Sequence, residues 1–403
     1  MGLNLLNLTK IVGQIETERI YEHVLKIEGV RHPIDTPQRL NETADYIHTR
    51  FEQYGLAVIE HNFKVEGFDS TFRNIEGSLG TGDGPELLVV SHYDTQYGCP
   101  GADDNGSAVA VMLEAARVLA QEKTVRNVRF VSFTLEELNP ARVLRLRKIA
   151  QGFGLTDKHN RYTSAHTQRI MKQLNEFHAH GYAAGKNPIQ VISEFKSQFA
   201  DQMSESETKY VEEVEKLSKE ITLTSWAGKT AVIGSGSWVE DALRTRKKLS
   251  GVICLDTVGY TSNKEHSQAL PKGIDPNMFQ MYNVKDATVG NFLAVVGDVN
   301  SGRLLQSFCT QCKLGSVGLP FVSVQVPLGY AMITQVMFDL VRSDHAPFWR
   351  AGIPAIFLTD TAELRNPYYH TQADTIDKLD FDFLARLCKA TVATAIDLTT
   401  RQS

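Results

Sequence analysis

Apolar residues recur along this chain at two spacings, one typical of helices and the other typical of strands. In residues 38–53, Leu40, Ala44, Ile47 and Phe51 follow one another at intervals of three or four residues. An α-helix turns once in about 3.6 residues, so this interval places the four side chains on one face. The pattern therefore predicts an amphipathic helix that packs one face against a core.

Shorter apolar runs, some of them alternating with polar residues, are typical of strands. Residues 56–65 and 71–79 alternate and are separated by Gly67, which predicts an antiparallel pair. A run that is apolar on both faces predicts a strand in the interior of a sheet. The expected strands are residues 56–65, 71–79, 86–92, 125–134, 251–256 and 354–359, and the expected helices are residues 16–26, 38–53, 107–121, 299–312, 344–351 and 381–399.

The alternation of strands and helices stops between Pro140 and Trp226. This stretch is charged, has the composition of helices, and shows no strand pattern. We therefore expect a helical insertion at residues 140–229 within a catalytic domain made of residues 1–139 and 230–403. The order of the remaining elements predicts an α/β fold, a three-layer α/β/α sandwich with a mixed central sheet.

The composition excludes several classes of protein. The net charge of −5 lacks the basic excess needed to bind nucleic acid or an anionic membrane surface. Five cysteines in 403 residues are too few, and odd in number, for a disulfide framework, which favours a reducing compartment. The first ten residues lack the features of a signal peptide, and no apolar run is long enough for a membrane span. We expect a cytoplasmic protein without nucleic-acid or membrane partners, and the sequence does not indicate its oligomeric state.

Acidic and imidazole side chains follow several of the strand-like runs. The carboxyl ends of parallel strands meet at one edge of a sheet, so these side chains are expected to lie together. Glu136 and Glu137 would repel one another unless a cation or a shared proton intervened. Asp94 stands two residues after His92, where a carboxylate can orient the imidazole. The segments concerned are Ser91–Asp94, Gly101–Ser107, Thr134–Leu138, Asp256 at the end of a strand, and His370 in Pro367–Thr375.

Taken in order, these residues resemble the binuclear zinc peptidase family that contains bacterial leucyl aminopeptidases, glutamate carboxypeptidases and glutaminyl cyclases. The likeness covers roughly residues 38–137 and 234–403. It implies a zinc-exopeptidase-like fold, two zinc ions per chain and peptide substrates. Cobalt or manganese would suit the same ligand types. The metal ligands that the resemblance implies are His92, Asp103, Glu137, Asp256 and His370.

The resemblance also implies roles for individual side chains. Asp103 would bridge both ions, and Glu136 would be the general base that takes a proton from the attacking water. Asp94 would support His92 from behind. Tyr369 resembles an oxyanion donor of some family members, although packing beside His370 explains an aromatic residue there equally well. Residues 343–345 resemble a family stretch that is expected to shape the site from behind.

Hydrolysis that releases N-terminal residues from peptides is the favoured function, and three alternatives remain. Glutaminyl cyclases share the fold with one zinc ion, but they have a small residue after the bridging aspartate, where this chain has Asp104. A carboxypeptidase would need a basic group for the substrate carboxylate, and Arg342, Arg365 and Lys378 lie near pocket segments. A non-catalytic receptor-like domain is disfavoured because Glu136 and all the ligands are present.

The insertion begins three residues after Glu137, so we expect it to form a lid or an interaction subdomain beside the site. Cys309 and Cys312 have the spacing of a redox motif, but no second pair lies nearby, which favours ordinary thiols or an occasional disulfide. The histidines of the insertion are expected on solvated helix faces rather than in a third metal site. They are His159, His166, His178 and His180.

Overall fold

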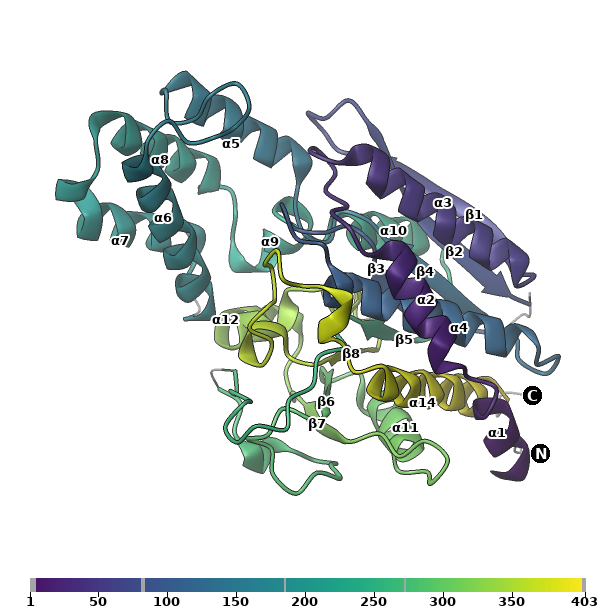
Figure 1. Cartoon of the computed structure of the whole chain (residues 1–403). Coiled ribbons are helices and arrows are strands. Elements are labelled where there is room, and N and C mark those ends of the chain that lie inside the picture. The colour runs from purple at the N-terminus through teal and green to yellow at the C-terminus, as the bar shows by residue number, and fades with distance from the viewer. Residues whose placement is uncertain (1–4, 81–83, 185, 272, 401–403) are drawn as a thin grey trace.

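The computed structural model describes residues 5–80, 84–184, 186–271 and 273–400, and its centre is a mixed sheet (Figure 1). In the described residues this sheet has eight strands, in the order β1-β2-β4-β3-β5-β8-β6-β7. The central strands β4, β3, β5 and β8 run parallel to one another, while β2 pairs antiparallel with β1 and β4, and β6 pairs antiparallel with β8. The strands are β1 (Ala57–Lys64), β2 (Thr71–Leu79), β3 (Glu86–His92), β4 (Val128–Phe133), β5 (Leu249–Leu255), β6 (Leu293–Gly297), β7 (Phe321–Gln325) and β8 (Ala355–Thr359).

Helices cover both faces of this sheet and form the three layers that the sequence predicts. Successive side chains of a strand point to opposite faces, so Val89 packs with one helical layer and Val90 with the other. The first layer holds α1 (Leu5–Val12), α2 (Thr17–Ile27), α3 (Pro37–Gln53), α4 (Ala108–Ala120), α11 (Gly302–Cys312) and α14 (Phe381–Thr400). The second holds α9 (Leu223–Lys229), α10 (Ile233–Arg244), α12 (Tyr330–Val336) and α13 (Ala346–Arg350).

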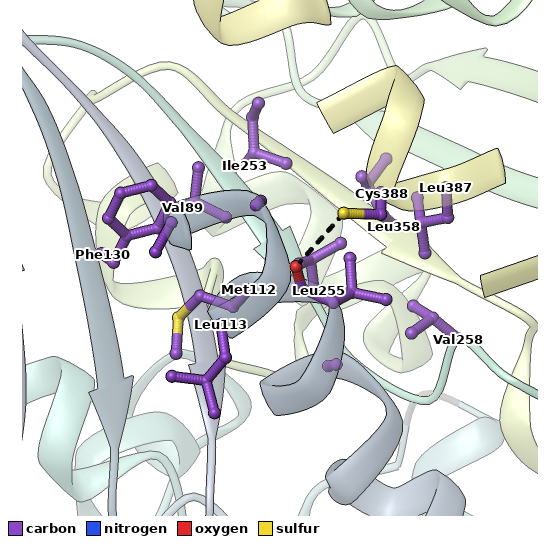
Figure 2. Close-up of a cluster of buried hydrophobic side chains, with 14 of the residues drawn as sticks. Val89, Met112, Leu113, Phe130, Ile253, Leu255, Val258, Leu358, Leu387 and Cys388 are labelled. Carbon is purple, nitrogen blue, oxygen red and sulfur yellow. Dashed lines mark hydrogen bonds between the residues drawn. The ribbon is translucent and has the colours of Figure 1, made fainter. Parts of the chain in front are cut away.

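In the first layer, helices α4 and α14 pack against the middle of the sheet. Figure 2 shows Val89 and Ile253 of the sheet among side chains of these two helices. Burial of apolar surface of this kind contributes about 25 cal/mol per Å². The Cys388 thiol donates to the carbonyl of Val111, 3.6 Å away, which links α14 to α4. The loops at the carboxyl ends of the central strands therefore start from a well-packed core of sheet and helices.

Within the residues that the structure describes, the regular elements of the insertion are helices. The first four of them along the chain stand apart from the sheet (Figure 1), whereas α9 packs in the second layer. These four helices bury a separate apolar cluster that includes Ile170, Ile192, Phe195 and Val211. The two ends of the insertion lie together, because the Asn139 N–H donates to the carbonyl of Thr230 at 2.7 Å. Its helices are α5 (Pro140–Gly152), α6 (Ala165–Ala183), α7 (Pro188–Phe199) and α8 (Glu205–Ser218), followed by α9.

One ion pair ties the insertion to the N-terminal part of the chain. Arg147 of α5 donates from both terminal nitrogens to Asp35, at 2.7 and 2.6 Å. His159, His166 and His180 are exposed and His178 is half-buried. No group of metal-ligand geometry includes any of these histidines within the described ranges.

The expected strands and helices are all present with small shifts of their ends. Strands β6 and β7 and helices α1, α10 and α12 were not expected. The two strands are only five residues long, and an apolar run of that length fits a loop or a helix end as well as a strand. Cys309 and Cys312 lie buried in α11 as free thiols. Over the residues that the structure describes, no helix has the length and apolar character to cross a bilayer.

Candidate metal centre

The chemically active side chains lie just beyond the carboxyl ends of three adjacent parallel strands. His92 is the last residue of β3, Glu136 and Glu137 follow β4, and Asp256 follows β5. Strand β3 pairs with β4 on one side and β5 on the other, so the three strand ends are neighbours. His370 reaches the same place from the loop after β8.

Two groups of potential ligands form there, each with its atoms within 4.8 Å of one another. The first group is His92, Glu136 and Asp256, and the second is Asp104, Glu137 and His370. Asp104 links the two, because its Oδ1 lies 3.3 Å from His92 Nε2 and its Oδ2 lies 3.0 Å from His370 Nε2. One carboxylate thus faces both imidazoles, which is the position of a bridging ligand.

Asp103 does not occupy this position, contrary to the expectation from the sequence. Its Oδ1 accepts a hydrogen bond from the backbone N–H of Gly259 at 2.8 Å, and its Oδ2 accepts one from the Asn366 amide at 2.8 Å. The side chain therefore holds two neighbouring loops together behind the site. Which of two adjacent carboxylates points inward depends on the backbone of residues 102–107, which the sequence does not reveal.

That backbone is fixed from both sides. Asp374, four residues after His370, accepts the N–H groups of Asp103 and Asp104 at 2.8 and 3.1 Å. The Asn105 side chain donates to the carbonyl of Leu255 and accepts from the N–H of Thr257. The peptide bond between Asp104 and Asn105 is cis. These contacts tie the turn that carries Asp104 to the loops that carry Asp256 and His370.

Asp94 supports the site in a way that differs in part from the expectation. Its two oxygens accept the backbone N–H groups of Glu136 and Glu137, both at 3.1 Å. Its Oδ1 lies 3.7 Å from His92 Nδ1, which is an ion-pair distance and too long for a hydrogen bond. Asp94 therefore fixes the backbone of the glutamate pair as well as lying behind His92.

Two further side chains hold the carboxylates in place. Ser343 donates to Asp256 Oδ2 at 2.6 Å, which agrees with the expectation that residues 343–345 shape the site from behind. Gln96 donates to Glu137 Oε2 at 2.9 Å. Sequence reasoning missed Gln96, because a single amide four residues after a ligand histidine carries no recognisable pattern.

The electrostatics of the group are those of crowded buried charges. Burial raises the pKa of Glu137 to about 7, and the neighbouring Asp104 acts in the same direction. Burial and the charges of Asp256 and Glu137 raise the pKa of Glu136 well above its usual range, although His92 opposes this. Burial disfavours the imidazolium of His370, yet Glu137 and Asp104 raise its pKa to about 10. Protons shared among imidazoles and carboxylates thus balance the charge, and a cation would displace them.

The donor set fits zinc. Imidazole nitrogens and carboxylate oxygens are ordinary zinc ligands. His370 Nε2 lies 3.0 Å from Asp104 and 3.3 Å from Glu137, yet it is buried without a hydrogen bond to either. Glu137 Oε1 is also buried without a partner. Lone pairs that converge without hydrogen bonds are expected where a cation binds between them.

Two cavities open beside these groups. One is lined by Asp104, both glutamates and His370, together with Trp226 from α9. The other is a mostly apolar cavity of about 120 Å³ that is lined in part by residues 268–271 and 274–279. Asp256, Arg342 and Tyr369 line both cavities, so the apolar one adjoins the metal groups. Its apolar walls include Leu270, Ile274, Phe279, Phe292, Val296, Val324, Leu340 and Phe357.

Comparison with known proteins agrees with this geometry. The family model described as Peptidase family M28 matches residues 74–291 and 321–395, more than two thirds of the chain. YfbL of Escherichia coli K12, described as an uncharacterized protein, is 26% identical over 383 residues, which are 92% of this chain and 84% of that protein. Aminopeptidase YwaD of Bacillus subtilis is 50% identical over 55 residues, or 13% of this chain and 12% of the relative.

Solved structures share the fold at low sequence identity. The LapA aminopeptidase of Legionella pneumophila has a TM-score of 0.58 at 17% identity, covering 99% of this chain and 76% of its own. A Zn-dependent exopeptidase of Parabacteroides distasonis has a TM-score of 0.54 at 14% identity, covering 95% and 98%. The glutaminyl cyclase of Porphyromonas gingivalis has a TM-score of 0.52 at 17% identity, covering 94% and 98%. At these identities the likeness shows the fold alone.

Proposed function

The chain belongs to peptidase family M28, and from this premise we propose that it releases N-terminal residues from peptides with two zinc ions as its cofactor. Metal-dependent hydrolysis of peptide bonds is the activity of the family, and the chain is a metallopeptidase with peptide substrates. The observation that carries the proposal is the position of Asp104 between two groups of ligands, with Glu136 beside them.

We assign one zinc ion to His92, Asp104 and Asp256, and the other to Asp104, Glu137 and His370. Zinc ions in this site would supply Lewis-acid polarisation of the scissile carbonyl and activation of the attacking water. Asp94 and Ser343 orient the ligands through the contacts described above. Asp104 replaces Asp103 in the ligand set that the sequence predicted.

Glu136 moves the proton in this scheme. Its carboxylate lies in the group with His92 and Asp256, whereas the carboxylate of Glu137 lies in the group with His370. It accepts a proton from the water and delivers it to the amine that leaves. Tyr369 lines both cavities, which supports the proposal that its hydroxyl donates to the oxyanion, and its ring also stacks on His370 with the centroids 3.8 Å apart.

The charges around the site favour an amino-terminal over a carboxy-terminal specificity. A carboxypeptidase needs a free cation for the substrate carboxylate, and the three candidates are engaged elsewhere. Arg342 donates to Glu363 at 2.6 Å, Arg365 is buried over the ring of Phe292 and donates to Gln268, and Lys378 donates to Asp377.

The apolar cavity supports a preference for N-terminal residues with apolar side chains. Its walls come from β6, β7 and β8 and from residues 268–271 and 274–279, and Asp256 and Tyr369 also line it. A side chain bound there would place the adjoining peptide bond next to the metal groups. Peptides that differ only in the first residue would test this preference through their kcat/KM values.

A glutaminyl cyclase remains the second candidate, because a cyclase is among the proteins that share the fold. The sequence argument against it compared Asp104 with the small residue that follows the bridging aspartate. If Asp104 is the bridging ligand, the residue after the bridge is Asn105 and not Asp104, so the comparison no longer argues against a cyclase. Zinc content separates the two functions, since about two ions per chain are expected for the peptidase and one for the cyclase.

Replacing Glu136 by Gln tests the mechanism. The change keeps the size of the side chain and removes the base, so kcat should fall by roughly two to four orders of magnitude. Zinc content should stay at the wild-type value because Glu137 supplies the ligand. Peptides with free and with blocked amino termini should be assayed beside each other. Cleavage of the blocked peptides at equal rates, or a Glu136→Gln variant of normal kcat, would contradict the proposal.

A further inference from the structure

Arg31 is an arginine in the interior of the protein, on the segment between α2 and α3. Its side chain is fully buried, and its guanidinium donates five hydrogen bonds, all to backbone carbonyls rather than to a carboxylate. Burial of a charged group is costly unless its hydrogen bonds are satisfied. A buried arginine whose hydrogen bonds all go to backbone carbonyls is therefore a device for holding main chain in a fixed shape.

Three of the five carbonyls belong to the loop that connects His92 with Asp104. Arg31 Nε donates to Tyr93 O at 2.7 Å, Nη1 donates to Pro100 O at 2.9 Å, and Nη2 donates to Gly101 O at 2.9 Å. Tyr93 directly follows His92, and Gly101 stands three residues before Asp104. One planar group thus connects the first part of this loop with its last part.

The other two carbonyls anchor the guanidinium to its own segment. Nη1 also donates to Ile27 O at 3.0 Å and to Gly29 O at 2.9 Å. The main chain of Arg31 adds a second connection, because its N–H donates to Thr95 Oγ1 at 2.9 Å and its carbonyl accepts the Thr95 N–H at 3.3 Å. The loop is therefore held at its beginning, middle and end by one residue.

The fit around the guanidinium is close. Gly101 has a φ of +64°, and a Cβ atom there would lie 2.7 Å from Arg31 Nη2 and 2.4 Å from the carbonyl oxygen of Asp104. The backbone next to Asp104 and the guanidinium thus approach one another as closely as glycine allows. A displacement of the arginine would be transmitted to the turn that carries Asp104.

We propose that Arg31 is a positioning residue of the metal centre, which sets the distance between His92 and Asp104 by clamping both ends of the loop between them. The inference rests on the proposed zinc site, and it extends that site to a part of the chain that the family model does not match, because residue 31 precedes residue 74. A lysine could not replace this arginine, since an ammonium group lacks the planar fork that reaches several carbonyls at once.

The chain offers a matched control in Arg39. This arginine also binds carbonyls at the C-terminal end of α2, donating to Lys26 O at 2.7 Å and to Glu28 O at 3.0 Å. Its three hydrogen bonds to carbonyls all go to residues 26–28 and not to the loop between His92 and Asp104. Two of them are half-buried and the third is exposed. Arg39→Lys therefore perturbs the same segment without touching the loop.

The test compares Arg31→Lys and Arg39→Lys with the wild-type full chain. The zinc dissociation constant is measured by competition with a chelator, and amide hydrogen exchange of residues 93–106 is measured in the zinc-free proteins. Arg31→Lys should bind zinc about 10- to 100-fold more weakly, the usual effect of removing a group that orients a ligand, and its loop should exchange faster. Arg39→Lys should match the wild type in both measurements.

Zinc affinity within threefold of the wild type for Arg31→Lys, or an equal loss for Arg39→Lys, would overturn the inference. If Arg31→Lys does not fold, Thr95→Val carries the test, because it removes the acceptor of the Arg31 N–H and should weaken zinc binding severalfold. A wild-type chain that binds no zinc would overturn the proposed function. In that case, amide hydrogen exchange of residues 93–106 in the zinc-free proteins would still decide whether Arg31 holds this loop in place.

Discussion

The two adjacent aspartates of the metal loop provide a direct test of the site. Asp103→Asn and Asp104→Asn are the same chemical change one residue apart, but the structure gives them different consequences. Asn at position 103 keeps an acceptor for the Gly259 N–H and loses the acceptor of Asn366. Leaving that buried amide unpaired costs about 1–3 kcal/mol of stability. Zinc content should nevertheless remain that of the wild type.

In the wild type, the two carboxylate oxygens of Asp104 lie 3.3 Å from His92 Nε2 and 3.0 Å from His370 Nε2. Asn at position 104 removes the negative charge between these two imidazoles. Both zinc sites lose a ligand, so zinc content should fall below one ion per chain and peptide cleavage should disappear. The stabilisation by zinc should disappear as well. At a free zinc concentration of one hundred times the dissociation constant it is worth about 2.7 kcal/mol.

Metal analysis after dialysis and thermal unfolding with and without a chelator measure these quantities. The wild type and Asp103→Asn should each unfold at a lower temperature when zinc is removed, whereas Asp104→Asn should unfold at the same temperature in both conditions. The reverse result, with zinc lost from Asp103→Asn and retained by Asp104→Asn, would refute the assignment of the bridge.

Two further predictions concern the insertion and an acid-sensitive histidine. Arg142 donates to Leu217 O and Ser218 Oγ, so residues 142 and 218 lie close enough for a short linker to join them. Replacing residues 143–217 by such a linker should leave zinc bound and raise kcat/KM for long peptides, relative to dipeptides, about tenfold. An unchanged ratio would count against a lid. Burial lowers the pKa of His23 to about 3. The His23 imidazole therefore takes up a proton near pH 6.5 in the unfolded chain but not in the folded chain. The stability of the fold falls as the pH drops, by about 2 kcal/mol in total at pH 5. In zinc-free protein, chemical denaturation should show that His23→Gln loses about 1.6 kcal/mol less stability than the wild type between pH 6.5 and 5. An equal loss would show that His23 is not the group responsible.

The sequence predicted the parts of the fold that depend on long regular patterns. The run at residues 86–92 matches β3 residue for residue, because a strand covered on both faces must be apolar throughout. The site residues at strand ends followed from the same reasoning, since His92, Glu137 and Asp256 sit where parallel strands end. Asp104 could not be chosen over Asp103 in this way, because the choice lies in the backbone of an irregular turn.

Contacts between distant segments were equally out of reach. Arg31 looks like an ordinary surface residue in the sequence, and only the folded chain brings it to Tyr93 and Gly101. The apolar cavity draws its walls in part from β6 and β7, two strands that were not expected from the sequence. The sequence therefore predicted the reacting groups better than the groups that position them or select the substrate.

The joint at which the insertion leaves and rejoins the catalytic domain has a consequence for how such enzymes diversify. The Asn139 N–H meets the carbonyl of Thr230, and the N–H groups of Val232 and Ile233 donate to the carbonyls of Glu136 and Leu135 at 2.7 and 2.8 Å. The backbone of the glutamate pair is thus held by the returning chain, whatever is placed between residues 139 and 230. Surface segments whose two ends are already together tolerate exchange. Natural variation can lengthen, shorten or replace this segment, and so alter access to the site, while the reacting carboxylates stay where they are.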